Sequence, residues 1–273
     1  MDNSQVKFLE EKSRHIRYLV MDEIGKLGVG HVGGCLSVVE ALTVLYYKQM
    51  NIDPKNPKME GRDRFVLSKG HAGPAVYAVL ADKGYFDISE LDTLNKPETN
   101  LPSHCDMNRT IGIDMTAGSL GQGISAAVGM AKASKIKKDN AHIYCIIGDG
   151  ESQEGEVWEA AMAASHFKLN NLIVFTDHNK MQIDGTLEEV MNLTSLYKRW
   201  EAFGWNVFEV DGHNVEAIDD AVEKAKKSVD KPSMIILDTI KGKGVSFVEA
   251  AGVGNHNMPI SAEQRLQALK ELE

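Results

Sequence analysis

Short apolar runs that alternate with amphipathic stretches constrain the fold of this chain more than any other sequence feature. The apolar runs lie at 141–147, 172–176, 206–210 and 234–239. The stretches at 155–167, 193–203 and 214–229 carry apolar residues at helical spacing. Strands and helices that alternate in this way form a parallel sheet with helices on both faces. We therefore expect an α/β fold, with residues 1–273 forming one domain.

The first half of the chain is more helical. We expect helices over 6–27 and 36–49, a short buried strand over 63–68, and then a turn and a helix that ends near Leu80. Residues 87–113 are rich in Pro and Asn and are expected to form loops. A further helix over 121–135 follows a glycine-rich turn.

Charge and cysteine content exclude several function classes. The net charge is -9, from 30 Lys and Arg against 39 Asp and Glu, and no basic face typical of a nucleic-acid partner is visible. Cys35, Cys105 and Cys145 lie far apart and form no C-x-x-C pair, so a reducing cytoplasm is expected. The charged start of the chain and the absence of a membrane-length apolar run indicate neither a secretory signal nor a membrane segment.

Polar residues follow the two central apolar runs, where ligands bind in parallel α/β sheets. Gly148-Asp149-Gly150 follows one run, and Asn179 follows the next, ahead of Ile183-Asp184-Gly185. Glycines let the backbone approach a bulky anion, and carboxylate and amide oxygens are ligands that Mg²⁺ prefers. The pair of loops therefore predicts a site for Mg²⁺ and a diphosphate.

These motifs resemble those of thiamine-diphosphate enzymes, and the run GDGESQEGEVWEAA at 148–161 is similar to transketolases in particular. The resemblance covers nearly the whole chain. Further loops in the family's order are GHVGG at 30–34, LSKGHA at 67–72, GSLGQG at 118–123 and KGKGVS at 241–246. The resemblance implies the thiamine-diphosphate-binding fold and a role in carbohydrate metabolism, such as the pentose phosphate pathway.

The family's functional residues can be carried over where the motifs match. Asp149, Asn179 and the carbonyl of Met181 would bind Mg²⁺. His71 and Gly150 would face the diphosphate. Gly118, Ser119 and Leu120 would cradle the cofactor's rings, with Ile183 on the thiazolium. Four residues would line the substrate channel as catalytic groups: His31, His71, His104 and His256. Glu154 would join a charge network across a dimer interface.

Some positions depart from the family pattern. Cys105 follows His104 where related sequences often have Pro, and Asn257 follows His256 where Gly is typical. Ala117 replaces the usual Thr before the glycine. The other histidines are expected at the surface or as satisfied groups at helix ends: His15, His142, His166, His178 and His213.

In the family, a glutamate on a second domain contacts the pyrimidine ring of the cofactor. No second strand–helix series follows His256, so the resemblance implies a two-chain transketolase. A C-terminal subunit would supply that glutamate, in a dimer of heterodimers that transfers a two-carbon unit between sugars or sugar phosphates. Two alternatives remain open: another thiamine enzyme, such as deoxyxylulose-phosphate synthase or a 2-oxo acid dehydrogenase, and a non-catalytic binding module.

Overall fold

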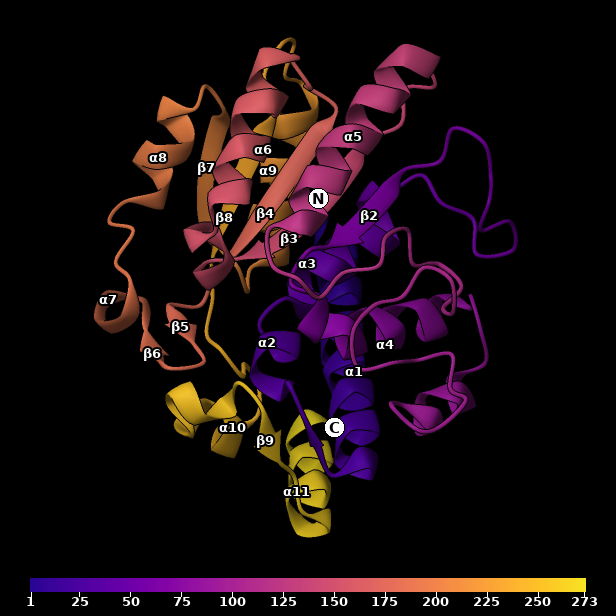
Figure 1. Cartoon of the computed structure of the whole chain (residues 1–273). Helices are drawn as coiled ribbons and strands as arrows, with labels where there is room; N and C mark the ends of the chain where they lie inside the picture. The colour runs from indigo at the N-terminus through magenta and orange to yellow at the C-terminus, as the bar shows by residue number, and fades with distance from the viewer.

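The structure, a computed structural model, describes residues 1–273 and has a five-stranded parallel sheet at its centre (Figure 1). The strand order is β2-β3-β4-β8-β7, with every neighbouring pair parallel. The strands are β2 (Arg64–Leu67), β3 (Ile143–Gly148), β4 (Leu172–His178), β7 (Asn206–Asp211) and β8 (Ser233–Asp238). The expected parallel α/β sheet is therefore confirmed.

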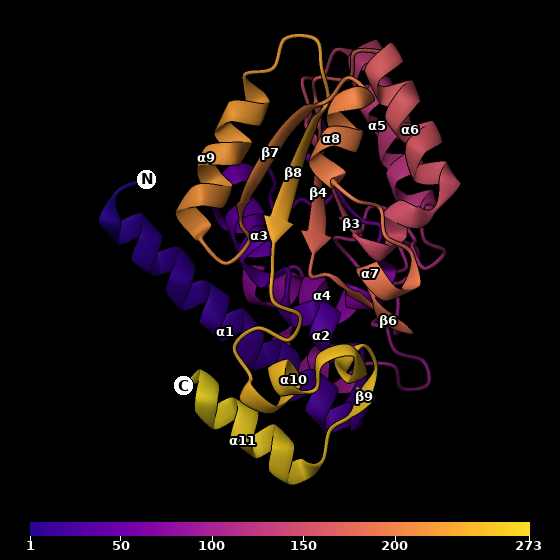
Figure 2. The ribbon, with the colours of Figure 1, turned by 90° about the vertical axis from the view of Figure 1, so that its left-hand side faces the viewer.

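Helices cover both faces of this sheet. The helices are α1 (Asn3–Leu27), α2 (Val32–Leu36), α3 (Val39–Val44), α4 (Gly73–Lys83), α5 (Gln122–Lys137), α6 (Gly155–His166), α7 (Leu187–Val190), α8 (Leu196–Ala202), α9 (Val215–Lys226), α10 (Ser246–Ala250) and α11 (Ala262–Leu272). A core of 47 buried hydrophobic residues joins one face to α1–α4 and α9, and a core of 20 joins the other to α5, α6 and α8. Figure 2 shows α9 and α6 on opposite sides of the sheet.

Two small sheets lie beyond the central one. The strands β1 (Val29–Gly30) and β9 (Met258–Pro259) pair antiparallel, and β5 (Met181–Gln182) pairs with β6 (Gly185–Thr186). The first pair joins the beginning of the chain to its last quarter. The second forms a hairpin immediately after the central strand β4.

The expectation of one continuous helix over 36–49 is wrong. This segment is divided into the end of α2, α3 and a π-helix over Leu45–Gln49. The break covers Ser37 and Val38, and the backbone leaves helical geometry at Val38, with φ -107° and ψ 6°. The Ser37 hydroxyl donates to the carboxylate of Asp177 at 2.7 Å, a tertiary contact at the break that periodicity alone does not reveal.

The last helix, α11, is not among the expected elements, although Leu266, Leu269 and Leu272 follow one another at helical spacing. Its N-cap is Ser261, where a capping box with Gln264 satisfies the first backbone groups. It packs beside α1, where Arg265 bonds to Asp22 and its side chain lies over Gly25 (Figures 1 and 2). No helix of the chain is long and apolar enough to cross a bilayer.

Candidate active site

Four histidines from four separate segments meet near the carboxyl edge of the sheet. The ring centroid of His31 lies 5.5 Å from that of His71, 5.6 Å from His104 and 5.3 Å from His256. The rings of His71 and His256 are 5.1 Å apart. The structure thus brings together all four histidines that the sequence motifs indicate, with His31 at their centre. We call them the histidine cluster.

Local structure places each ring of the histidine cluster. His31 lies between β1 and α2, and the pairing of Gly30 with Met258 brings the segment that carries His256 alongside it. His71 lies in a 3₁₀ helix that follows β2. His104 comes from the long loop before α5, and its Cδ2 lies 3.5 Å from the position that a Cβ on Gly118 would take.

The imidazoles of the histidine cluster are neutral at pH 7, because the pKa of each is lowered. Burial lowers the pKa of His31, His71 and His104, and the nearby His104 and Lys241 lower that of His31 further. Burial, together with Lys241, lowers the pKa of His256 to about 4. A neutral imidazole has one donor and one acceptor nitrogen. Each ring can therefore donate a hydrogen bond and accept a proton at neutral pH, and it can give that proton back in a later step.

Asp149 is a buried carboxylate at the end of β3. Its oxygens accept from the backbone N–H groups of Gly150 at 2.7 Å and Lys180 at 2.5 Å. Burial, with the nearby Asp177 carboxylate, raises the pKa of Asp149 to about 7. A buried carboxylate that faces another one and has no cationic partner of its own is an environment that a bound cation would stabilise.

Asn179 and the carbonyl of Met181 complete a set of oxygen donors. The Asn179 amide nitrogen donates to Asp177 at 2.8 Å, and its Oδ1 accepts from the N–H of Met181 at 3.1 Å. No group of three or more His, Cys, Asp or Glu side chains could hold a metal ion. One carboxylate, one amide and one carbonyl suit a hard cation such as Mg²⁺ that shares its remaining positions with phosphate oxygens. The residues present therefore fit a Mg²⁺–diphosphate group.

Asp177 is the structural centre of this region, although the sequence motifs do not point to it. The side chain is fully buried and accepts four hydrogen bonds. The donors are Lys69 at 2.5 Å, Ser37 at 2.7 Å, Asn179 at 2.8 Å and Thr239 at 2.5 Å. Burial opposes its charge, but Lys69 and these donors hold the pKa of Asp177 below its ordinary value. Its position two residues before Asn179 at a strand end was the available signal.

Glu151 is a second connector that sequence reasoning missed. This buried carboxylate accepts from the N–H groups of Gly121 and Gly148, both at 2.9 Å, and from the hydroxyl of Ser68. It thereby ties the glycine-rich loop before α5 to the end of β3 and to the segment after β2. Three loops that carry candidate residues are held by one side chain.

The candidate ring-contacting residues are more accessible than the candidate metal ligands. Gly118 and Ser119 are exposed, Leu120 is half-buried, and Ile183 at the β5–β6 turn is 67% exposed. Glu154 is exposed at the start of α6.

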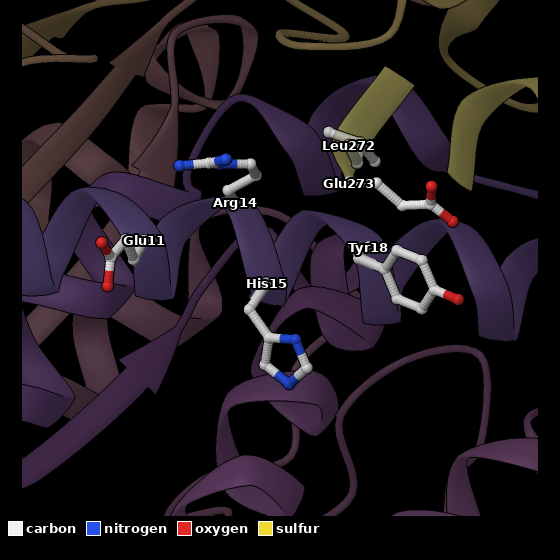
Figure 3. Close-up of a pocket in the computed structure, with 6 residues that line it drawn as sticks. All are labelled: Glu11, Arg14, His15, Tyr18, Leu272 and Glu273. Carbon is white, nitrogen blue, oxygen red and sulfur yellow. The ribbon is translucent and has the colours of Figure 1, made fainter. Parts of the chain in front are cut away.

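A separate surface hollow of about 590 Å³ lies between α1 and the end of the chain (Figure 3). It is lined by Glu11, Arg14, His15, Tyr18, Leu272 and Glu273. In Figure 3 these side chains point in different directions rather than at a common point. The hollow shares no residue with the histidine cluster, so the candidate site is assigned to the carboxyl edge of the sheet.

Comparisons with known proteins identify relatives over nearly the whole chain. The family described as "Transketolase, thiamine diphosphate binding domain" matches residues 10–272. The chain is 59% identical to the 6-deoxy-6-sulfo-D-fructose transketolase subunit SqwG of Clostridium sp. (strain MSTE9), covering 97% of this chain and 96% of that protein. It is 41% identical to one of the subunits of the apulose-4-phosphate transketolase of Phocaeicola vulgatus, covering 98% of this chain and 95% of that protein.

Solved structures show the same fold. The transketolase from Campylobacter jejuni aligns with a TM-score of 0.91 and 34% identity, covering 100% of this chain and 43% of that one. The complex of Pichia stipitis transketolase with sedoheptulose 7-phosphate aligns with a TM-score of 0.89 and 33% identity, covering 95% and 40%. The chain thus spans about two fifths of these solved transketolases. It belongs to the transketolase family and matches the N-terminal subunits of that family over almost their whole length.

Proposed function

We propose that this chain is the thiamine-diphosphate- and Mg²⁺-binding subunit of a two-chain transketolase. The single observation that carries the proposal is the histidine cluster beside the buried Asp149 and Asn179. Residues 1–273 form the diphosphate-binding domain. The reaction is the transfer of a two-carbon ketol unit from a ketose to an aldose.

Each part of the site has a proposed role in holding the cofactor. Asp149, Asn179 and the carbonyl of Met181 hold Mg²⁺, while His71 and the backbone of Gly150 face the diphosphate. The rings lie on the segment of Gly118, Ser119 and Leu120 and against Ile183. When bound, thiamine diphosphate supplies the stabilisation of negative charge on carbon that cleavage of a ketose requires.

The histidine cluster would act on the sugar. We assign His31 and His256 to moving protons at the donor hydroxyls, because both are neutral and their rings lie 5.3 Å apart. His104, whose ring lies 5.6 Å from that of His31, would hold the hydroxyl of the two-carbon unit. Glu154, exposed at the start of α6, would face a second copy of the chain.

A partner chain is part of this proposal. Its support is that the similar proteins are named as subunits and have nearly the length of this chain, whereas solved transketolases are more than twice as long. The partner would contribute the pyrimidine-binding domain and a glutamate. Two copies of each chain would then form the active assembly in the cytoplasm.

The identities of the relatives rank the candidate donor sugars. The relative named for 6-deoxy-6-sulfo-D-fructose is 59% identical, against 41% for the one named for apulose 4-phosphate. We therefore propose 6-deoxy-6-sulfo-D-fructose as the donor. Fructose 6-phosphate and xylulose 5-phosphate are the matched comparisons, because they carry the same ketol end and a phosphate instead of a sulfonate.

The experiment has two steps. Calorimetric titration of this chain with thiamine diphosphate, with and without Mg²⁺, should show binding that depends on Mg²⁺. Ketol transfer to an aldose acceptor is then measured for this chain alone, the partner alone and the two together. Turnover only by the two together supports the proposal, and turnover by this chain alone would overturn the two-chain assignment. Cofactor binding without transfer from any of the three donors would refute the proposed reaction.

A further inference from the structure

A buried ion pair lies outside the histidine cluster and has no role in the proposed chemistry. Arg17 of α1 contacts the carboxylate of Glu40 of α3 at 2.6 Å, and the two side chains are only 8% and 7% exposed. The ring of His213, at the start of α9, lies with its Nδ1 3.1 Å from the same carboxylate. Three elements that are distant in sequence therefore meet at Glu40.

The hydrogen bonds of His213 define its tautomer. Its Nε2 lies 2.8 Å from the backbone nitrogen of Ile240, and an N–H group can only donate. Nε2 must therefore be the unprotonated, accepting nitrogen, so Nδ1 carries the proton and donates to Glu40. The carboxylate thus orients the ring, and the ring in turn holds a backbone amide.

Arg17 holds the same loop at a second point. Its Nε donates to the carbonyl of Lys243 at 2.9 Å. Arg17 also lies where a side chain on Gly244 would be, since its Cδ is 2.9 Å from the Cβ position there. The loop that leaves β8 is thereby held on both sides of Lys241, and in Figure 2 it runs past α1 before it reaches α10.

Lys241 connects this loop to the histidine cluster. The side chain is buried, and its Nζ lies 3.3 Å from Nδ1 of His256. Its backbone carbonyl accepts from the side chain of Asn255 at 3.0 Å, next to His256 in sequence. An amine of lysine donates to an imidazole nitrogen, so Nδ1 of neutral His256 accepts and Nε2 keeps the proton.

We propose that Arg17, Glu40 and His213 form a clasp that positions Lys241 and thereby sets the tautomer and placement of His256. The three are positioning residues, because none of them contacts the histidine cluster directly. The consequence for turnover rests on the proposed function of His256. The coupling between the clasp and the His256 ring does not, and it can be measured without cofactor or partner.

Two substitutions of His213 separate the clasp from a general structural role. His213→Gln keeps an acceptor near the position of Nε2 and retains the contact to the Ile240 amide. His213→Asn keeps a donor near the position of Nδ1, facing Glu40, and loses the contact to Ile240. Both remove one imidazole and leave the buried ion pair of Arg17 and Glu40 in place, so both are expected to fold.

The measurement is the NMR titration of the His256 ring in the full chain, with the resonance assigned by its loss in His256→Gln. In His213→Asn, the loop is released at Ile240 while the contact from Arg17 to Lys243 remains, so Lys241 is held less closely beside the ring and the measured pKa of His256 rises toward its ordinary range. In His213→Gln it stays as in the parent chain. In Lys241→Met, the measured pKa of His256 should rise most, and this rise is the upper limit for the rise in His213→Asn.

The outcomes are distinguishable from failure of the proposed function. A His256 titration that is unchanged in His213→Asn but raised in Lys241→Met overturns the clasp. Circular dichroism and urea unfolding confirm that each variant is folded before titration. In the assembled enzyme, His213→Asn should lower kcat roughly tenfold with KM within about twofold. A raised His256 pKa with unchanged kcat would support the clasp and refute the role of His256 in turnover.

Discussion

The amide nitrogen of Asn179 donates to the carboxylate of Asp177 at 2.8 Å, and this contact decides which way the Asn179 amide faces. Because the nitrogen is held by Asp177, the oxygen is left on the side of Met181, whose N–H donates to it. The same carboxylate is paired with Lys69 in a fully buried ion pair. One acidic side chain thus orients a proposed metal ligand and neutralises a buried lysine.

We predict that Asp177→Asn destabilises the chain and weakens binding of Mg²⁺ and thiamine diphosphate. Removing one partner of a buried pair typically costs about 3–5 kcal/mol, because the other charge is left without a partner. The double variant Asp177→Asn with Lys69→Met should recover part of the stability but not the binding. Urea unfolding measures the first effect and calorimetry the second. Equal stability of the single and double variants would show that Lys69 is not the group left uncompensated.

Asp149→Ala should uncouple stability from binding. The carboxyl is buried with a raised pKa, so relief of its burial should offset the loss of the hydrogen bonds from Gly150 and Lys180 and leave the stability of the unliganded chain nearly unchanged. Cofactor binding in the presence of Mg²⁺ should be lost, because the nearby Asp177 carboxylate is already engaged by its own donors. Thermal unfolding with and without cofactor gives both results in one experiment. Cofactor-induced stabilisation that persists in the variant would remove Asp149 from the metal site.

The histidine cluster should make the chain sensitive to mild acid. Its members have a lowered pKa in the folded state, to about 4 for His256, so between that value and about 6.5 the unfolded chain binds more protons. The histidine cluster therefore contributes a fall in the free energy of unfolding as pH drops from 7 toward 4, whereas the buried Asp149 carboxyl contributes in the opposite direction. His256→Gln should reduce the fall between pH 7 and pH 5, measured as urea midpoints. The exposed His166, changed to Gln in the same way, provides the control.

His256→Ala should affect turnover more than cofactor binding. The ring lies in the histidine cluster rather than among the oxygen donors around Asp149. In the assembled enzyme we expect kcat to fall about a hundredfold, as is typical for loss of a general acid–base group. The affinity for thiamine diphosphate should stay within about twofold. A loss of affinity equal to the loss of kcat would place His256 with the cofactor instead.

Two glycines give a contrasting pair for stability. A Cβ on Gly70 would lie 2.4 Å from the backbone carbonyl of Ala117, so Gly70→Ala must separate two loops of the site and should cost about 1–3 kcal/mol. Gly129 lies in α5 with nothing within 4 Å of its Cβ position, so Gly129→Ala should stabilise by about 0.5–1 kcal/mol. Urea unfolding of both variants tests the pair.

The sequence predicted the sheet because its apolar runs are short, regular and separated by clear helices. It predicted the histidine cluster through motifs, each of which is a continuous stretch of chain. The sequence did not reveal Asp177 and Glu151, because their hydrogen-bond donors lie on segments that are far away in sequence. Periodicity also failed at Ser37, where such a contact coincides with the break in the helix. Two local signals of α11 are present in the sequence, the capping box at Ser261 and the leucines at helical spacing from Leu266 to Leu272.

The short pairing of β1 with β9 has a consequence for how the chain folds. His31 is made early during synthesis, but it meets His256 only when Met258 and Pro259 can pair with Gly30 and Val29. The pairing joins segments that are far apart in sequence, and such long-range contacts form slowly compared with local helices. The sheet can therefore be largely formed on the ribosome while the histidine cluster is still incomplete. Competence for catalysis would be acquired as the last step of folding, after most of the core is already packed.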